Sequence, residues 1–167
     1  MTFKHLYILG IAALLTACSA QVSVPSDATP TEAQAQIFPD YRHIIIPPNI
    51  APLNFQLENP TTAAVATLTC GSTQMVVEAD EKGTFTLDSI EWKQLLAAAK
   101  GKAIDVTLYT ENDSKWLKHP AYTISVAKEP IDRYLSYRLI EPGYELYRQM
   151  GIYQRNLENF DEHIVYE

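Results

Sequence analysis

The chain has 167 residues, 47% of them hydrophobic, and a formal net charge of −7. This length suits one domain with extensions, and the apolar share is large enough for a packed core, which excludes a chain that is disordered throughout. The acidic balance argues against nucleic acid as a partner, because phosphate binding needs clustered Lys and Arg.

The N-terminal segment is predicted to be a signal peptide. Lys4 precedes an uncharged apolar run from Leu6 to Leu15 that is too short for a permanent membrane span. The run leads into Leu-Thr-Ala-Cys18, which resembles the lipobox of bacterial lipoproteins. The resemblance implies that residues 1–17 are removed, that Cys18 is lipidated, and that acyl chains anchor the protein to a membrane of the cell envelope. The alternative is an ordinary signal peptide in which Cys18 is incidental.

Lipidation of Cys18 would leave Cys70 without an intramolecular disulfide partner. Cys70 ends a strand-like run and has no Lys, Arg or His close in sequence, so we expect a buried structural thiol rather than a reactive one.

Residues 18–36 are dominated by Ala, Ser, Thr, Pro and Gln without an aromatic residue, which predicts a flexible tether. Residues 37–128 are predicted to form a mostly β domain. Short apolar or alternating runs, bounded by turn residues, indicate about seven strands. They lie at residues 42–46, 53–57, 64–70, 74–79, 84–87, 104–108 and 122–126. An immunoglobulin- or fibronectin-like sandwich is the fold that we expect from this pattern.

One helix is predicted inside the β domain. Asp88 and Glu91 have capping-box spacing, and Gly101 follows the segment from Ile90 to Lys100 as a helix stop. Four apolar residues recur at three- and four-residue intervals and predict a helix face packed on a sheet: Trp92, Leu95, Leu96 and Ala99.

Residues 129–167 form a Tyr-rich C-terminal extension, expected to be irregular with one short helix. Pro142 at a first turn and Gly151 as a stop indicate that helix, over Tyr144 to Met150. Polar residues from Arg155 to Glu162 predict an irregular end. Half-buried tyrosines of this kind need a surface to pack on.

No catalytic or metal site is predicted. His43, His119 and His163 are far apart and lack partners at metal-ligand spacing, and the cluster of Asp161 and Glu162 with His163 is interpreted as a solvated chain end. No nucleophile motif or phosphate loop occurs. We therefore expect a protein that is not an enzyme and needs no cofactor.

Two aromatic residues are the candidate binding residues. Trp116 and Tyr122 lie on the predicted hairpin between residues 104 and 126 and could stack on a sugar or a protein partner. Packing of the hairpin tip is the alternative interpretation.

Four segments resemble a family of large envelope lipoproteins of Gram-negative bacteria, labelled cytochrome c biosynthesis or TolB-like propeller proteins. They are residues 47–55 (PPNIAPLNF), 134–144 (YLSYRLIEPGY), 150–155 (MGIYQR) and 160–162 (FDE). The resemblance implies the N-terminal docking region of a larger or split lipoprotein, with a haem-bearing or propeller module as partner in cis or in trans. The family's Cys-x-x-Cys-His motif does not occur in this sequence, so no haem ligand is carried over. A surface module that binds carbohydrate or protein is the alternative function.

Overall fold

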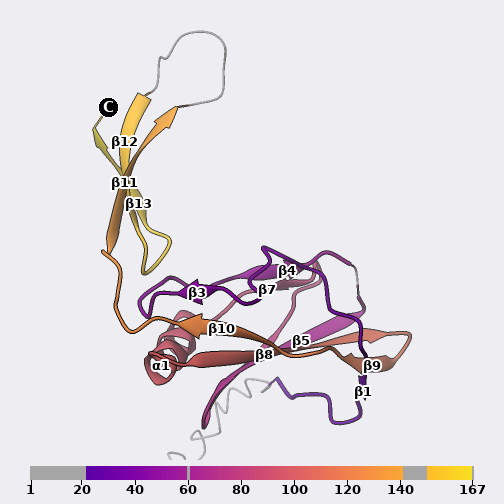
Figure 1. The fold of residues 1–167 in the computed structure, drawn as a ribbon. Coiled ribbons are helices and arrows are strands. Elements are labelled where there is room, and N and C mark those ends of the chain that lie inside the picture. Colours follow the sequence, from indigo (N-terminus) through magenta and orange to yellow (C-terminus); the bar gives the residue numbers. More distant parts are fainter. Residues whose placement is uncertain (1–21, 60, 141–149, 167) are drawn as a thin grey trace, which may run out of the picture.

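The computed structural model describes residues 22–59, 61–140 and 150–166. The predicted signal peptide and Cys18 lie outside these residues. The described chain forms a body, which holds most of the strands and the helix, and a small C-terminal sheet that projects from it (Figure 1). The predicted mostly β sandwich with one helix is confirmed.

The largest sheet of the body has seven strands and is built around β8 (Ala103–Asn112). β5 (Ala63–Cys70) pairs with one edge of β8, and β6 (Thr73–Glu78) pairs with β5. β9 (Lys115–Lys118) and β10 (Tyr122–Val126) share the other edge of β8. The tip of the predicted hairpin is therefore itself a strand.

A two-residue turn joins β8 to β9 and sets their register. Asp113 and Ser114 have φ angles of 50° and 59°, and a hairpin turn with both central residues in the left-handed region matches the twist of paired strands. Two short strands complete the large sheet by parallel pairing: β1 (Thr29–Pro30) with β9, and β3 (Ile45–Ile46) with β10.

The pairing of β1 corrects the predicted tether. Residues 29 onward lie against the body, since Thr31 N donates to Lys118 O at 3.0 Å and Ala35 is buried. The ordered body therefore begins before residue 37, the predicted domain boundary, and a tether over residues 18–36 is wrong from Thr29 onward.

A second, three-stranded sheet covers part of the core, and its order is β2 (Ile37–Phe38), β4 (Phe55–Leu57) and β7 (Thr84–Phe85). The only helix in the described residues is α1 (Ser89–Ala99). The Asp88 carboxylate accepts from Ile90 N and Glu91 N at 2.9 Å each, as an N-cap should.

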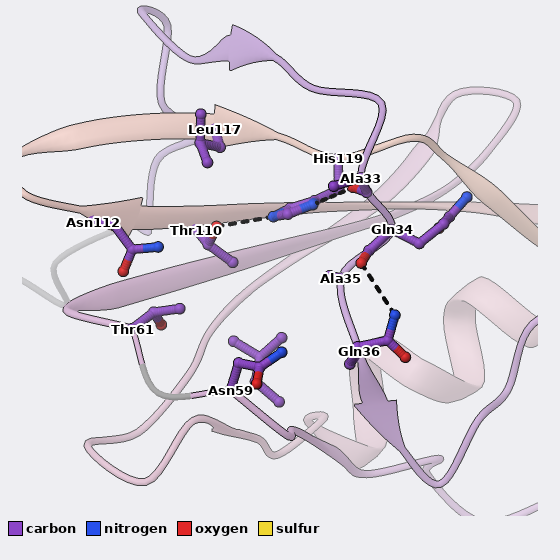
Figure 2. A pocket seen from close by; sticks show the side chains of 11 residues that line it. Ala33, Gln34, Ala35, Gln36, Asn59, Thr61, Thr110, Asn112, Leu117 and His119 are labelled. Atoms are coloured by element: carbon purple, nitrogen blue, oxygen red, sulfur yellow. Dashed lines mark hydrogen bonds between the residues drawn. The ribbon is translucent and has the colours of Figure 1, made fainter.

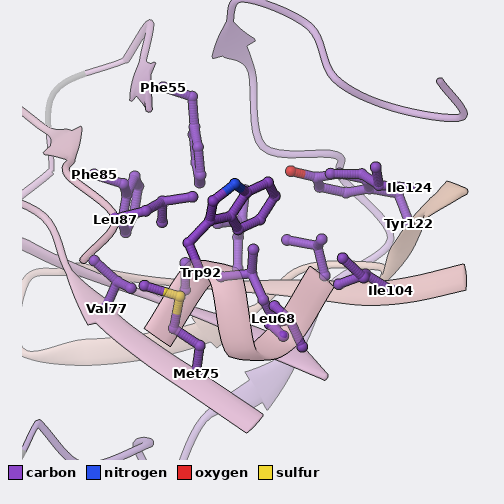
Figure 3. Packing of buried hydrophobic residues seen from close by; sticks show 14 of the residues in the cluster. Phe55, Leu68, Met75, Val77, Phe85, Leu87, Trp92, Ile104, Tyr122 and Ile124 are labelled. Carbon is purple, nitrogen blue, oxygen red and sulfur yellow. The ribbon is translucent and has the colours of Figure 1, made fainter. Parts of the chain in front are cut away.

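The core lies between the large sheet, the small sheet and α1 (Figure 3). Trp92 is fully buried at its centre, and its indole N–H donates to Ile50 O at 3.0 Å. Phe55 and Phe85 of the small sheet stack on each other with ring centroids 4.6 Å apart. The four helix residues predicted to face the sheet are all buried, which confirms the predicted apolar face.

The C-terminal extension is a three-stranded antiparallel sheet. Its strands are β11 (Tyr134–Ile140), β12 (Met150–Asn156) and β13 (Glu162–Tyr166). Of the run from Arg155 to Glu162, which is predicted to be irregular, residues 157–161 are irregular. Its two ends are not, because Arg155 pairs with both Leu135 and Glu162. Gly151 continues β12 instead of stopping a helix, while residues 141–149 of the predicted short helix lie outside the described part of the chain.

Candidate interaction surface

The C-terminal sheet stands away from the body on a connection of residues 127–133 (Figure 1). Residues of the body and the connection, together with the turn after β12, form hydrogen bonds at the base of this sheet. Ala51 N donates to Leu157 O at 2.8 Å. The Asn49 side chain forms two hydrogen bonds with the Ile131 backbone: its amide donates to the carbonyl at 2.9 Å, and its oxygen accepts from the backbone N–H at 3.0 Å. The Asn49 amide also donates to the Glu158 carboxylate at 3.1 Å. These bonds fix the base of the sheet, while the rest of its strands extends into solvent.

Large apolar side chains of the C-terminal sheet are exposed on both faces. In folded proteins, an exposed apolar patch of this kind marks an interaction site or an aggregation hazard. Between 43% and 71% of each of these side chains is accessible to solvent: Tyr134, Leu135, Leu139, Ile152, Ile164, Val165 and Tyr166. A three-stranded sheet gains stability when one face is covered, and no other described element covers either face.

One face of this sheet, here called the aromatic face, carries a tyrosine pair. Tyr137 and Tyr153 are cross-strand partners whose rings stack with centroids 6.0 Å apart. The Tyr153 ring lies over Gly151, where an added Cβ would be 2.8 Å from the ring. The Tyr137 hydroxyl donates to the Glu162 carboxylate, and this bond raises the pKa of Tyr137. Ile164, opposite Tyr153, continues the face onto β13.

β11 and β13 are both edge strands of the sheet in the described part of the chain, and the β13 edge is apolar at its end. β13 pairs only with β12 among the described strands, so one side of its backbone is available for a further strand. Every residue of β13 is exposed, and Ile164, Val165 and Tyr166 have high β-propensity. An exposed edge with such side chains is a template for strand addition.

The two aromatic residues proposed for binding do not form one surface. Trp116 is half-buried on β9, whereas Tyr122 on β10 is buried and packs in the core (Figure 3). Burial also raises the pKa of the Tyr122 hydroxyl well above its usual range. Tyr122 is therefore not available for stacking on a ligand, and the alternative interpretation, packing, holds for it. It alternates with Ile124 and Val126, and all three lie on the core face of β10.

A pocket of about 220 Å³ lies at the end of the sandwich, between residues 33–36, the side chains of Leu57, Asn59 and Thr61, and the β8–β9 hairpin (Figure 2). His119 is fixed at its edge. Nδ1 of His119 is 2.8 Å from Ala33 O, and Nε2 is 2.9 Å from Thr110 Oγ1. A carbonyl can only accept, so Nδ1 carries a proton, and in the neutral ring Nε2 accepts from the Thr110 hydroxyl. Sequence reasoning missed this pocket because three distant segments form it.

The described residues contain no group of three or more His, Cys, Asp or Glu side chains that could hold a metal ion. Among them, no helix is long and apolar enough to cross a membrane. Cys70 is buried with its thiol 3.8 Å from Ala98 O, so the predicted burial of this thiol is confirmed. No family model matches the chain, and comparison with curated proteins and with solved structures finds no match.

Proposed function

We propose that this chain is a lipid-anchored docking protein of the cell envelope, without catalytic activity of its own, whose C-terminal sheet binds a β-rich partner module. The observation that carries the proposal is the exposure of apolar side chains along a sheet that projects from an otherwise well-packed body. A body that buries Trp92 and Phe85 completely has no need of an additional sheet for its own core.

The geometry of the sheet supports a partner that supplies a strand. β13 offers a free backbone edge, and the aromatic face next to it offers rings and aliphatic groups for packing. Main-chain pairing gives such complexes affinity, and side-chain pockets give them specificity. A propeller or haem-bearing module of a related lipoprotein, in cis or in trans, is the partner that we favour from the sequence resemblance.

The anchor part of the proposal rests on the lipobox-like sequence before Cys18. A lipid at Cys18 would hold the body at a membrane surface, while residues 22–28 leave a short connection to the first paired strand. The projecting sheet would then meet partners held in the same envelope.

Photo-crosslinking in the source cells tests the docking role. A photoreactive residue replaces Val165, which is 56% exposed on β13, and the matched control carries it at Gln94 on the exposed side of α1. We expect irradiation to yield one discrete adduct with a second protein from position 165 and none from position 94. No adduct, the same adducts from both positions, or an adduct of two copies of this chain would contradict the proposal.

A further inference from the structure

The pocket beside His119 is lined by uncharged polar side chains, and four of them have no partner in the described part of the chain. Four carboxamides line it, and that of Gln36 donates to Gln34 O at 3.4 Å. The carboxamides of Gln34, Asn59 and Asn112 line it together with the Thr61 hydroxyl (Figure 2). None of these four side chains forms a hydrogen bond with another described residue. Each carboxamide offers both a donor and an acceptor. The pocket can therefore exchange several hydrogen bonds with one small ligand.

The absence of charge in the lining restricts the ligand. No Asp, Glu, Lys or Arg is among the lining residues. An ion that left water for this pocket would lose hydration without a counter-charge, and that loss is costly. A neutral ligand avoids this cost. Leu57 and Leu117 add apolar surface to the same pocket, which suits a ligand that has both hydroxyl groups and a hydrocarbon face.

The pocket is preorganised by bonds that a ligand need not form. His119 ties residue 33 to β8 through its bonds to Ala33 O and to the nearly buried Thr110 hydroxyl. Ala35 is buried beneath the same segment. Fixed walls reduce the conformational entropy that binding would otherwise cost.

An extended peptide does not suit this place. The edge of β9 next to the pocket already pairs with β1, in the register Thr29 with Leu117 and Pro30 with Lys118. Thr31 N then donates to Lys118 O. The backbone groups that a peptide strand would use are thus occupied within the chain.

We propose that this pocket binds a single neutral sugar unit. Vicinal hydroxyl groups donate and accept, as carboxamides do, and the ring C–H face matches the leucine side chains. A volume of about 220 Å³ is below the range of pockets for drug-sized ligands, about 300–1,000 Å³, and suits one ring. This site is independent of the docking sheet, because no residue of that sheet lines the pocket.

Saturation-transfer NMR on the full chain in detergent micelles tests the sugar site. The probes are glucose, galactose, mannose and N-acetylglucosamine, with glucuronate as the charged counterpart. We expect transfer to at least one neutral sugar, a Kd in the low millimolar range, and weaker or absent transfer to glucuronate. The amide shifts that change in the protein should belong to residues of the β8–β9 hairpin.

A double variant locates the binding. Asn59→Ala with Asn112→Ala removes two exposed carboxamides that bond no other described residue, so the fold should persist. We expect the sugar to bind about tenfold more weakly. Gln94→Ala removes an exposed carboxamide from α1, outside the pocket lining, and should change nothing. The proposal is overturned if no neutral sugar receives saturation, if the double variant binds like the wild type, or if glucuronate binds as strongly.

Discussion

At the scale of single residues, the Tyr122 hydroxyl is the most unusual group. Among the described residues it is the only buried side-chain oxygen or nitrogen without a hydrogen-bond partner. A buried, unsatisfied hydroxyl costs free energy because it has left water without compensation. The ring nevertheless fills the core beside Ile124. Packing of the ring thus decides the position of Tyr122, and the hydroxyl is buried as a consequence.

Tyr122→Phe should therefore stabilise the protein, by about 1 kcal/mol in free energy of unfolding. Tyr41→Phe is the contrasting variant, because the Tyr41 hydroxyl donates to Asn54 O at 3.4 Å, and it should be neutral or slightly destabilising. Urea denaturation at neutral pH measures both. A loss of stability in Tyr122→Phe would show that the hydroxyl has a partner, such as a buried water.

The same variant should change the alkaline limit of stability. Burial raises the pKa of Tyr122 in the folded state, whereas the pKa of tyrosine in the unfolded chain is about 10. The contribution of the protonated Tyr122 to the free energy of unfolding is therefore complete below a pH of about 10 and is lost as the pH rises further. The wild type should lose stability above that pH more steeply than Tyr122→Phe. Burial also raises the pKa of Tyr41. Stability should therefore still fall somewhat with rising pH in both the wild type and Tyr122→Phe.

At the scale of elements, local signals predicted α1 well and long-range pairings poorly. The N-cap, the apolar spacing and a glycine stop all lie within about 14 residues, and Gly101 indeed has a positive φ of 73°. β1, in contrast, has two residues whose strand conformation comes from β9, far along the chain. No local pattern could predict it.

The C-terminal sheet was missed for a different reason. β12 carries apolar and polar side chains on both faces and so lacks the clean alternation that predicts a strand with one buried face. In β11, Leu135, Tyr137 and Leu139 do alternate with polar residues, but the opposite face is mixed. Ser136 and Arg138, for example, share a face with Tyr134. Gly151, which suggested a helix stop, lies in a strand beneath the Tyr153 ring. The exposure that hid the sheet from sequence reasoning is also what marks it as a surface for a partner.

Asn49 is predicted to set how firmly this sheet is held. Asn49→Ala removes two bonds to Ile131 and one to Glu158, a local loss of about 2 kcal/mol. Trypsin should then cleave faster after Lys128 and Arg133 in the connection, while the stability of the body changes little. Asn112→Ala, on the β8–β9 hairpin, serves as control. Equal cleavage rates in wild type and Asn49→Ala would show that other contacts hold the sheet.

At the scale of the whole molecule, the account joins an anchor, a packed body and a projecting sheet. Cys18→Ser tests the anchor, because the serine side chain lacks the thiol that would carry the lipid. We expect the variant in the soluble fraction after centrifugation of cell lysates, and the wild type in the membrane fraction. A Cys18→Ser variant that still sediments with membranes would remove the lipoprotein proposal and leave the docking proposal standing.

The central claim is that the C-terminal sheet is covered by a partner in the envelope. Hydrogen–deuterium exchange compares the chain in its native membranes with the same chain purified in detergent. We predict that the amides of β13 exchange slowly in membranes and rapidly after purification, while the amides of α1 exchange alike in both. Exchange at β13 that is equally rapid in both samples would contradict the claim and leave a sheet that is exposed without a partner.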